Sequence, residues 1–307
     1  MEQSETGGNW ELWTMEFGDA ARDLKAYRNP PPVTPTGFEA LDALKGGGPC
    51  PGVHVLMGMP GAGKSALALD VALKVAMGRG RVLYVSAEMG RQQCLARLCS
   101  CLAAMGAAGA DGEPLQGFPW SRWEAMGAAC GPEGEDAGTR ALAALAKYAP
   151  GLVLADGGRA VTVPGLCAVI REAAAMGVSL VVVDYLQRLA WPEGQEPSDQ
   201  FQAVTRASKA VTAAAKEARV PALCLSSMNR AALKDGKPTM WGGRNSGDIE
   251  YDAETVMQLI PADEGAGTSG HRAVDLHVTK SRCGAQTGER PISLDLDGPH
   301  CMFSEYA

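Results

Sequence analysis

The segment that most constrains this chain runs from Gly58 to Ser65 and reads Gly-Met-Pro-Gly-Ala-Gly-Lys-Ser. It follows an apolar run at 53–57 and precedes a helix-favouring stretch at 66–77. In this setting glycines let backbone N–H groups approach phosphate oxygens, the lysine adds positive charge, and the serine hydroxyl can hold a magnesium ion. The sequence therefore predicts a nucleoside triphosphate site, contacted by Gly58, Pro60, Gly61, Ala62, Gly63, Lys64, Ser65 and Ala66.

Composition indicates a globular chain without a membrane segment. Its 307 residues are 46% hydrophobic, yet no apolar run reaches membrane-spanning length. The polar N-terminus Met-Glu-Gln-Ser-Glu is unlike a secretory signal. Nine cysteines are scattered without a Cys-x-x-Cys pair. We expect buried, reduced thiols and a cytoplasmic protein with no membrane partner.

Two regions are expected along the chain: an extension at 1–33 and a main domain at 34–307. Within the extension, an amphipathic helix is predicted over 9–28, because aromatic and apolar residues recur three or four positions apart. Pro30-Pro31-Pro32 ends this helix. Its aromatic stripe could be covered by its own domain or by a neighbouring subunit, and the pattern leaves both open.

The main domain alternates strands with helices, which predicts an α/β fold with a mostly parallel central sheet and helices on both faces. Helices are expected over 63–78, 90–105, about 137–149, 164–176 and 199–219. Strands are expected over 53–57, 82–86, 152–155, 180–184, 222–226, 256–260, 274–279 and 292–296. The last strands lack helices between them and should extend the sheet as hairpins.

Two carboxylates end predicted strands. Asp184 closes the apolar run Leu180-Val181-Val182-Val183, and in a phosphate-binding-loop protein such an aspartate contacts magnesium beside Ser65. Glu88 follows the strand at 82–86. Because strand ends of an open parallel sheet face the ligand crevice, Glu88 is a candidate for polarising the water that attacks the γ-phosphate. A solvated glutamate is the competing interpretation.

Lys280 and Arg282 lie two positions apart at the end of the strand predicted over 274–279, so both side chains should project from one face. Two exposed surface cations would explain the pattern. The functional alternative is a pair of cations that reaches a triphosphate bound by the next subunit.

Positive charge is concentrated locally in an acidic chain. The net charge is −7, but the segment 226–247 contains Arg230, Lys234, Lys237 and Arg244 against only Asp235. Nucleic-acid binding depends on local rather than total charge, so this segment is compatible with a phosphate backbone. A solvated loop would have the same composition.

The ordered set of motifs resembles the ATPase domain of DnaB-type replicative DNA helicases. The resemblance begins with Thr36-Gly37-Phe38 and the phosphate-binding loop, and continues through Ser86-Ala87-Glu88-Met89 and Asp184-Tyr185-Leu186-Gln187. It ends with Asn229-Arg230, the segment 246–254 and Lys280-Ser281-Arg282. It implies a RecA-like fold, ATP and Mg²⁺ as ligands, and a homo-oligomer, usually a hexameric ring around single-stranded DNA. A helicase loader is a candidate partner.

The resemblance also implies residue roles. Lys64 and Ser65 would bind phosphate and magnesium, with Asp184 supporting the metal and Glu88 as the catalytic carboxylate. Lys280 and Arg282 would act in trans on the neighbour's γ-phosphate, and Arg97 is similar to an arginine that stacks on the nucleotide base. DNA contacts would be made by Arg230, Arg244, Asn245 and Gly247.

Three departures from the family pattern bear on mechanism. Ser227 replaces a glutamine that senses the γ-phosphate, which puts the coupling of hydrolysis to movement in doubt. Asn245 replaces a glutamate in the DNA-contacting loop. Only about 33 residues precede the ATPase domain, too few for the helical collar of the family.

Three functions therefore remain open. The leading hypothesis is an ATP-driven helicase or translocase that acts in DNA replication. The alternative is a non-translocating ATP switch similar to the RecA, RadA and KaiC groups, which bind single-stranded DNA or protein partners. A third is a subunit that binds ATP and DNA but barely hydrolyses.

Overall fold

The computed structural model describes residues 33–121, 131–228, 233–234, 237–238, 252–262 and 270–306. The predicted N-terminal helix at 9–28 lies outside these residues. No helix in the described part of the chain is long and apolar enough to cross a membrane.

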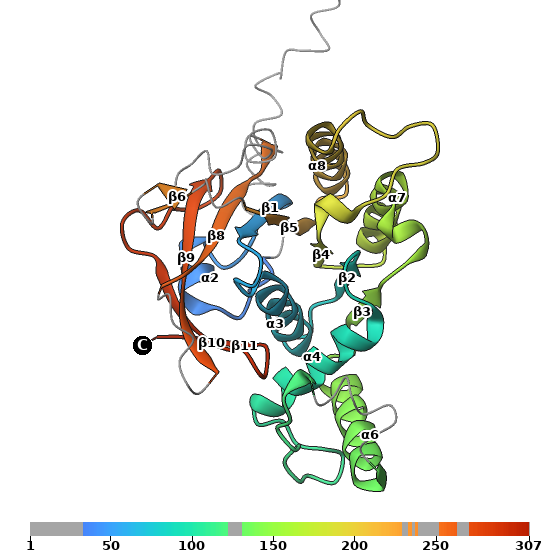
Figure 1. Ribbon diagram of the computed structural model, residues 1–307, viewed down its shortest axis with the longest axis vertical. Helices are drawn as coiled ribbons and strands as arrows, with labels where there is room; N and C mark the ends of the chain where they lie inside the picture. Colours follow the sequence, from blue (N-terminus) through green and yellow to red (C-terminus); the bar gives the residue numbers. More distant parts are fainter. Residues whose placement is uncertain are drawn as a thin grey trace, which may run out of the picture. The chain divides into compact units, whose positions relative to one another are not determined.

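A nine-stranded sheet forms the centre of the unit 34–307, in the order β11-β10-β9-β8-β1-β5-β4-β2-β3 (Figure 1). The strands from β8 to β3 in this order pair in parallel. They are β8 (Thr255–Pro261), β1 (Gly52–Gly58), β5 (Pro221–Ser227), β4 (Leu180–Asp184), β2 (Val82–Ser86) and β3 (Leu152–Ala155). The predicted α/β fold with a mostly parallel sheet is confirmed.

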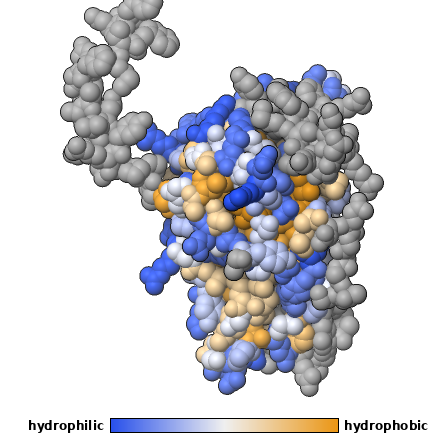
Figure 2. Space-filling model, turned by 90° about the vertical axis from the view of Figure 1, so that its left-hand side faces the viewer, coloured by the Kyte–Doolittle hydropathy of each residue, from blue (hydrophilic) through white to orange (hydrophobic). Residues whose placement is uncertain are grey.

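The C-terminal strands extend this sheet antiparallel, as the absence of intervening helices predicts. They are β9 (His271–Ser281), β10 (Ile292–Asp297) and β11 (Met302–Glu305). A separate short hairpin pairs β6 (Leu233–Lys234) with β7 (Lys237–Pro238). Figure 2 shows the side of the chain on which β9 lies in Figure 1, where hydrophilic and hydrophobic residues are interspersed.

Helices cover both faces of the sheet because its central strands are apolar on both sides. Leu180 and Val182 pack with one group of helices, and Val181 and Val183 with the other. The first group contains α2 (Glu39–Leu44), α3 (Lys64–Met77), α4 (Arg91–Ala104) and α6 (Gly131–Tyr148). The second contains α7 (Val163–Ala175) and α8 (Gln200–Glu217), and two 3₁₀ turns, η3 (Gly158–Val161) and η4 (Leu186–Arg188), lie between strands and helices.

Helix α6 begins at Gly131, about six residues before the predicted start. The earlier start is compatible with Pro132, because proline is tolerated in the first helical turn, where its missing N–H has no partner to lose.

One cysteine prediction is wrong. Cys50 and Cys283 form a disulfide across a sequence separation of 233 residues. The antiparallel return of β9 brings the segment after Ser281 beside the turn before β1, a proximity that spacing along the chain does not reveal. The other cysteines of the described residues, Cys94, Cys99, Cys101, Cys167, Cys224 and Cys301, are buried free thiols as expected.

Candidate active site

The loop between β1 and α3 has the backbone shape of a phosphate cradle. Gly61 and Gly63 have φ angles of 77° and 97°, in the left-handed region that favours glycine. A Cβ on Gly63 would lie 2.8 Å from Leu296 Cδ2, so a larger residue has no room there. Helix α3 begins directly after this loop at Lys64, and the backbone N–H groups of a helix N-terminus suit the binding of an anion.

Lys64 lies inside the cradle and contacts its backbone. Its Nζ donates hydrogen bonds to Gly58 O at 2.8 Å and to Met59 O at 3.0 Å. Burial lowers the pKa of Lys64, while Asp184 and Glu88 act in the opposite direction. A phosphate would supply the same kind of opposite charge and stabilise the ammonium form.

Asp184 is held at the end of β4 by its neighbours. It is almost fully buried, and Tyr84 Oη on the adjacent strand β2 donates to Asp184 Oδ2 at 2.7 Å. Burial raises the pKa of Asp184, and hydrogen bonds from Tyr84 and Ser65 oppose that rise. The Ser65 hydroxyl and the Asp184 carboxylate are oxygen donors of the kind that Mg²⁺ prefers, so their proximity fits the predicted metal.

A cavity of about 620 Å³ joins these groups. Of the predicted site residues, it is lined by Pro60, Gly61, Gly63, Lys64, Ser65, Ala66, Glu88, Arg97 and Asp184. Gly58 and Ala62 lie in the loop but do not line the cavity. Ser227, which departs from the family pattern, lines it at the end of β5.

Trp120 is a cavity residue that the sequence did not indicate. Arg97 Cζ on α4 lies 4.1 Å from the centroid of a Trp120 ring, a cation–π distance. Trp120 N donates to Pro299 O at 2.9 Å, and Ser100 Oγ donates to Phe118 O at 2.6 Å. These bonds connect the 118–120 segment to α4 and to the β10–β11 turn. No spacing pattern in this Gly- and Pro-rich part of the sequence marks Trp120 as a site residue.

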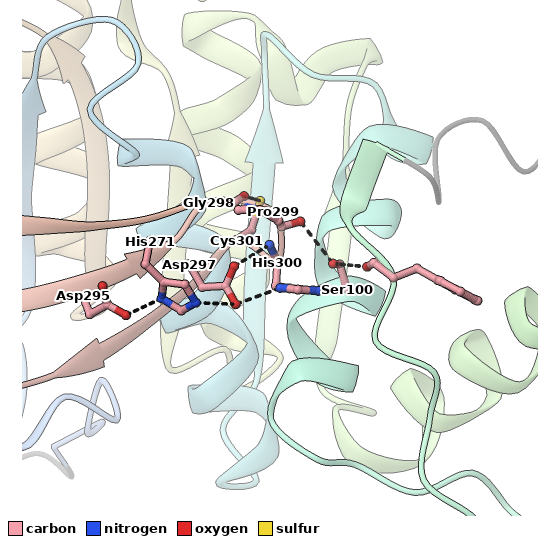
Figure 3. Close-up of polar contacts among 9 residues, drawn as sticks. Ser100, His271, Asp295, Asp297, Gly298, Pro299, His300 and Cys301 are labelled. Atoms are coloured by element: carbon pink, nitrogen blue, oxygen red, sulfur yellow. Dashed lines mark hydrogen bonds and ion pairs between the residues drawn. The ribbon is translucent and has the colours of Figure 1, made fainter. Parts of the chain in front are cut away.

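The β10–β11 turn is itself fixed by alternating imidazoles and carboxylates (Figure 3). His271 Nδ1 lies 2.6 Å from Asp295 Oδ2, and His300 Nδ1 lies 2.7 Å from Asp297 Oδ2. Hydrogen bonding to Asp295 raises the pKa of His271. Within the described ranges, no group of three or more His, Cys, Asp or Glu side chains could hold a metal ion.

Arg272 is a second residue that the sequence analysis missed. It lies on β9, far from the phosphate-binding loop in sequence, and donates from Nη2 to Gly61 O at 2.5 Å. It also lines the cavity.

Lys280 and Arg282 do not line this cavity. Arg282 N donates to Glu254 O at 2.7 Å, and Arg282 Nη1 lies 3.7 Å from Glu254 Oε1. Lys216 Nζ lies 2.8 Å from the same Glu254 oxygen. The cations are thus separate from the cradle of their own chain.

The predicted DNA-contacting residues Arg230, Arg244, Asn245 and Gly247 lie outside the described residues. Their role stays a prediction.

The comparisons with known proteins agree on one protein family. The profile of the DnaB-like helicase C terminal domain matches residues 34–295. The chain is 29% identical over 283 residues to the replicative DNA helicase DnaB of Leifsonia xyli, covering 89% of this chain and 56% of that protein. It is 27% identical over 256 residues to the replicative DNA helicase DnaC of Bacillus subtilis, covering 81% and 52%.

The fold is shared with a solved DnaB-like replicative helicase, whose structure also describes that protein's interactions with primase. It superposes with a TM-score of 0.73 at 20% identity, covering 96% of this chain and 67% of that one. This likeness supports the RecA-like fold. The chain spans about half the length of the curated relatives that it matches.

Proposed function

Because this chain belongs to the DnaB-like helicase C-terminal domain family, we propose that it is an ATP-driven helicase that moves along single-stranded DNA during replication. The observation that carries the proposal is the incomplete site within one chain. Lys64, Ser65, Asp184 and Glu88 meet at one cavity, whereas Lys280 and Arg282 lie elsewhere. A neighbouring subunit would complete it.

Within one subunit, the cradle and Lys64 would hold the triphosphate, and Glu88 would orient the attacking water. Ser65 and Asp184 would hold Mg²⁺. When bound, the ion neutralises charge on the phosphate oxygens. Tyr84 fixes the carboxylate that faces it.

Between subunits, Lys280 and Arg282 would stabilise the charge that develops on the transferring phosphoryl group. Heterologous contacts of this kind generate a ring when the rotation closes, and a hexamer is the assembly we propose. Residues 1–33 would form a linker segment that precedes the ATPase domain and docks on the adjacent subunit.

The proposed substrate strand would lie along Arg230, Arg244, Asn245 and Gly247, whose contacts to phosphates carry no base identity. A helicase loader would place the ring on DNA. The protein would act in the cytoplasm.

One observation favours a second candidate, the non-translocating ATP switch. Ser227 lines the cavity, and its short side chain extends less far toward a γ-phosphate than the glutamine of the family pattern. The family match over residues 34–295 argues for the helicase.

The separating experiment measures ATP hydrolysis with and without single-stranded DNA, alongside unwinding of a forked duplex. DNA-stimulated hydrolysis with unwinding supports the helicase. Stimulated hydrolysis without unwinding or movement would transfer support to the switch.

The shared site has its own test. Arg282→Ala and Glu88→Ala proteins should each be inactive, whereas an equal mixture should regain activity. With random mixing, about a quarter of the heterologous interfaces would combine an intact Glu88 with an intact Arg282. If the mixture stays inactive although both variants co-assemble, the shared site is excluded.

A further inference from the structure

Arg272 reaches the phosphate-binding loop from a strand that is distant in sequence. It is the second residue of β9, and its Cα pairs in register with Leu296 on β10. From there its guanidinium donates to Gly61 O at 2.5 Å. A Cβ built on Gly63 would lie 3.6 Å from Arg272 Nη2, so the guanidinium lies against both left-handed glycines of the loop.

The chemistry of this group suits a bound anion. A guanidinium carries five N–H donors in one plane and stays protonated at neutral pH. The Gly61 carbonyl accepts from Nη2 and thereby fixes the orientation of the guanidinium plane, and Arg272 is one of the residues that line the cavity. Burial lowers the pKa of Arg272, which means that its charge is partly desolvated, and a partly desolvated cation binds an anion more strongly.

We propose that Arg272 is a phosphate-binding residue of its own subunit's nucleotide site, oriented by the Gly61 carbonyl. This inference rests on the proposed function, because it requires a nucleoside triphosphate on the cradle. It adds a cation in cis to Lys64 and differs from the proposed action of Lys280 and Arg282 on the neighbour. The ligand it recognises is the phosphate chain rather than the base.

The test compares the affinity of Arg272→Gln and Arg272→Lys proteins for fluorescent ATP and GTP analogues in the presence of Mg²⁺. Arg290→Gln is the matched control, because Arg290 lies in the β9–β10 loop and does not line the cavity. Loss of one charge-assisted hydrogen bond to phosphate should weaken binding about 10- to 100-fold in Arg272→Gln. Lysine should restore part of it by returning the charge, and both analogues should respond alike.

Several results would overturn the proposal. These are binding as tight as in Arg290→Gln, a loss that lysine does not restore, or a loss confined to one base. If affinity is lost in Arg272→Gln and lysine does not restore it, Arg272 would only hold the Gly61 backbone in place. Lys64→Ala separates this failure from that of the proposed function. If Lys64→Ala binds the analogues as tightly as the wild type, the proposed nucleotide site is wrong. If Lys64→Ala binds them weakly and Arg272→Gln binds them as tightly as the wild type, only the role of Arg272 is overturned.

Discussion

The Tyr84 hydroxyl donates a 2.7 Å hydrogen bond to Asp184 Oδ2 across two adjacent parallel strands. Burial and the Asp184 charge raise the pKa of Tyr84 well above its usual value, so the hydroxyl stays a donor at any working pH. The bond fixes one oxygen of the carboxylate that we expect to support magnesium. Groups that orient metal-binding side chains tune metal affinity strongly.

Tyr84→Phe should therefore raise the Mg²⁺ concentration needed for half-maximal ATP hydrolysis about 10-fold, in the range typical of such orienting residues. A magnesium titration at saturating ATP measures this. Tyr148→Phe, at the end of α6 and away from the cavity, is the control. An unchanged magnesium requirement in Tyr84→Phe would show that the bond serves packing only.

Lys64→Ala should reduce ATP hydrolysis by at least about 100-fold, because it removes the cation that we propose stabilises the charge of the transition state. Lys147→Ala removes an exposed lysine from α6 and should retain full activity. The measurement compares the steady-state ATPase rates of the two variants with that of the wild type. Comparable rates in the two variants would contradict the phosphate-cradle assignment.

Opening the Cys50–Cys283 disulfide should lower the free energy of unfolding by about 2–4 kcal/mol, the usual range for a disulfide. Thermal unfolding with and without reductant measures the change. Cys50→Ser protein should show the lower melting temperature in both conditions. A reductant effect of equal size in Cys50→Ser would mean that another disulfide is responsible.

Because of His54, the free energy of unfolding should fall as the pH is lowered. Burial lowers its pKa to about 4 from an ordinary 6.5, so the unfolded chain binds a proton in this window that the folded chain does not. Stability is therefore retained above pH 6.5 and lost as pH falls toward 4, by about 3 kcal/mol at 1.36 kcal/mol per pKa unit.

Asp70 acts in the opposite sense, because burial raises its pKa to about 6. The comparison must therefore be made between the wild type and His54→Asn, by denaturant unfolding at several pH values. The variant should lose the acid-dependent fall that belongs to His54. Parallel curves for the two proteins would show that His54 does not titrate on unfolding.

Local sequence determined the alternating strands and helices, because hydrophobic periodicity and glycine spacing are properties of neighbours along the chain. It also determined the cradle, since Gly61, Gly63, Lys64 and Ser65 are contiguous, and it indicated Asp184 and Glu88 because strand ends in a parallel sheet converge. Tertiary structure alone decided which distant residues join them. Strand order and register bring Tyr84, Trp120 and Arg272 to the site and Cys50 to Cys283. The sequence could not reveal these contacts, because pairing between segments up to 233 residues apart leaves no periodic signal along the chain.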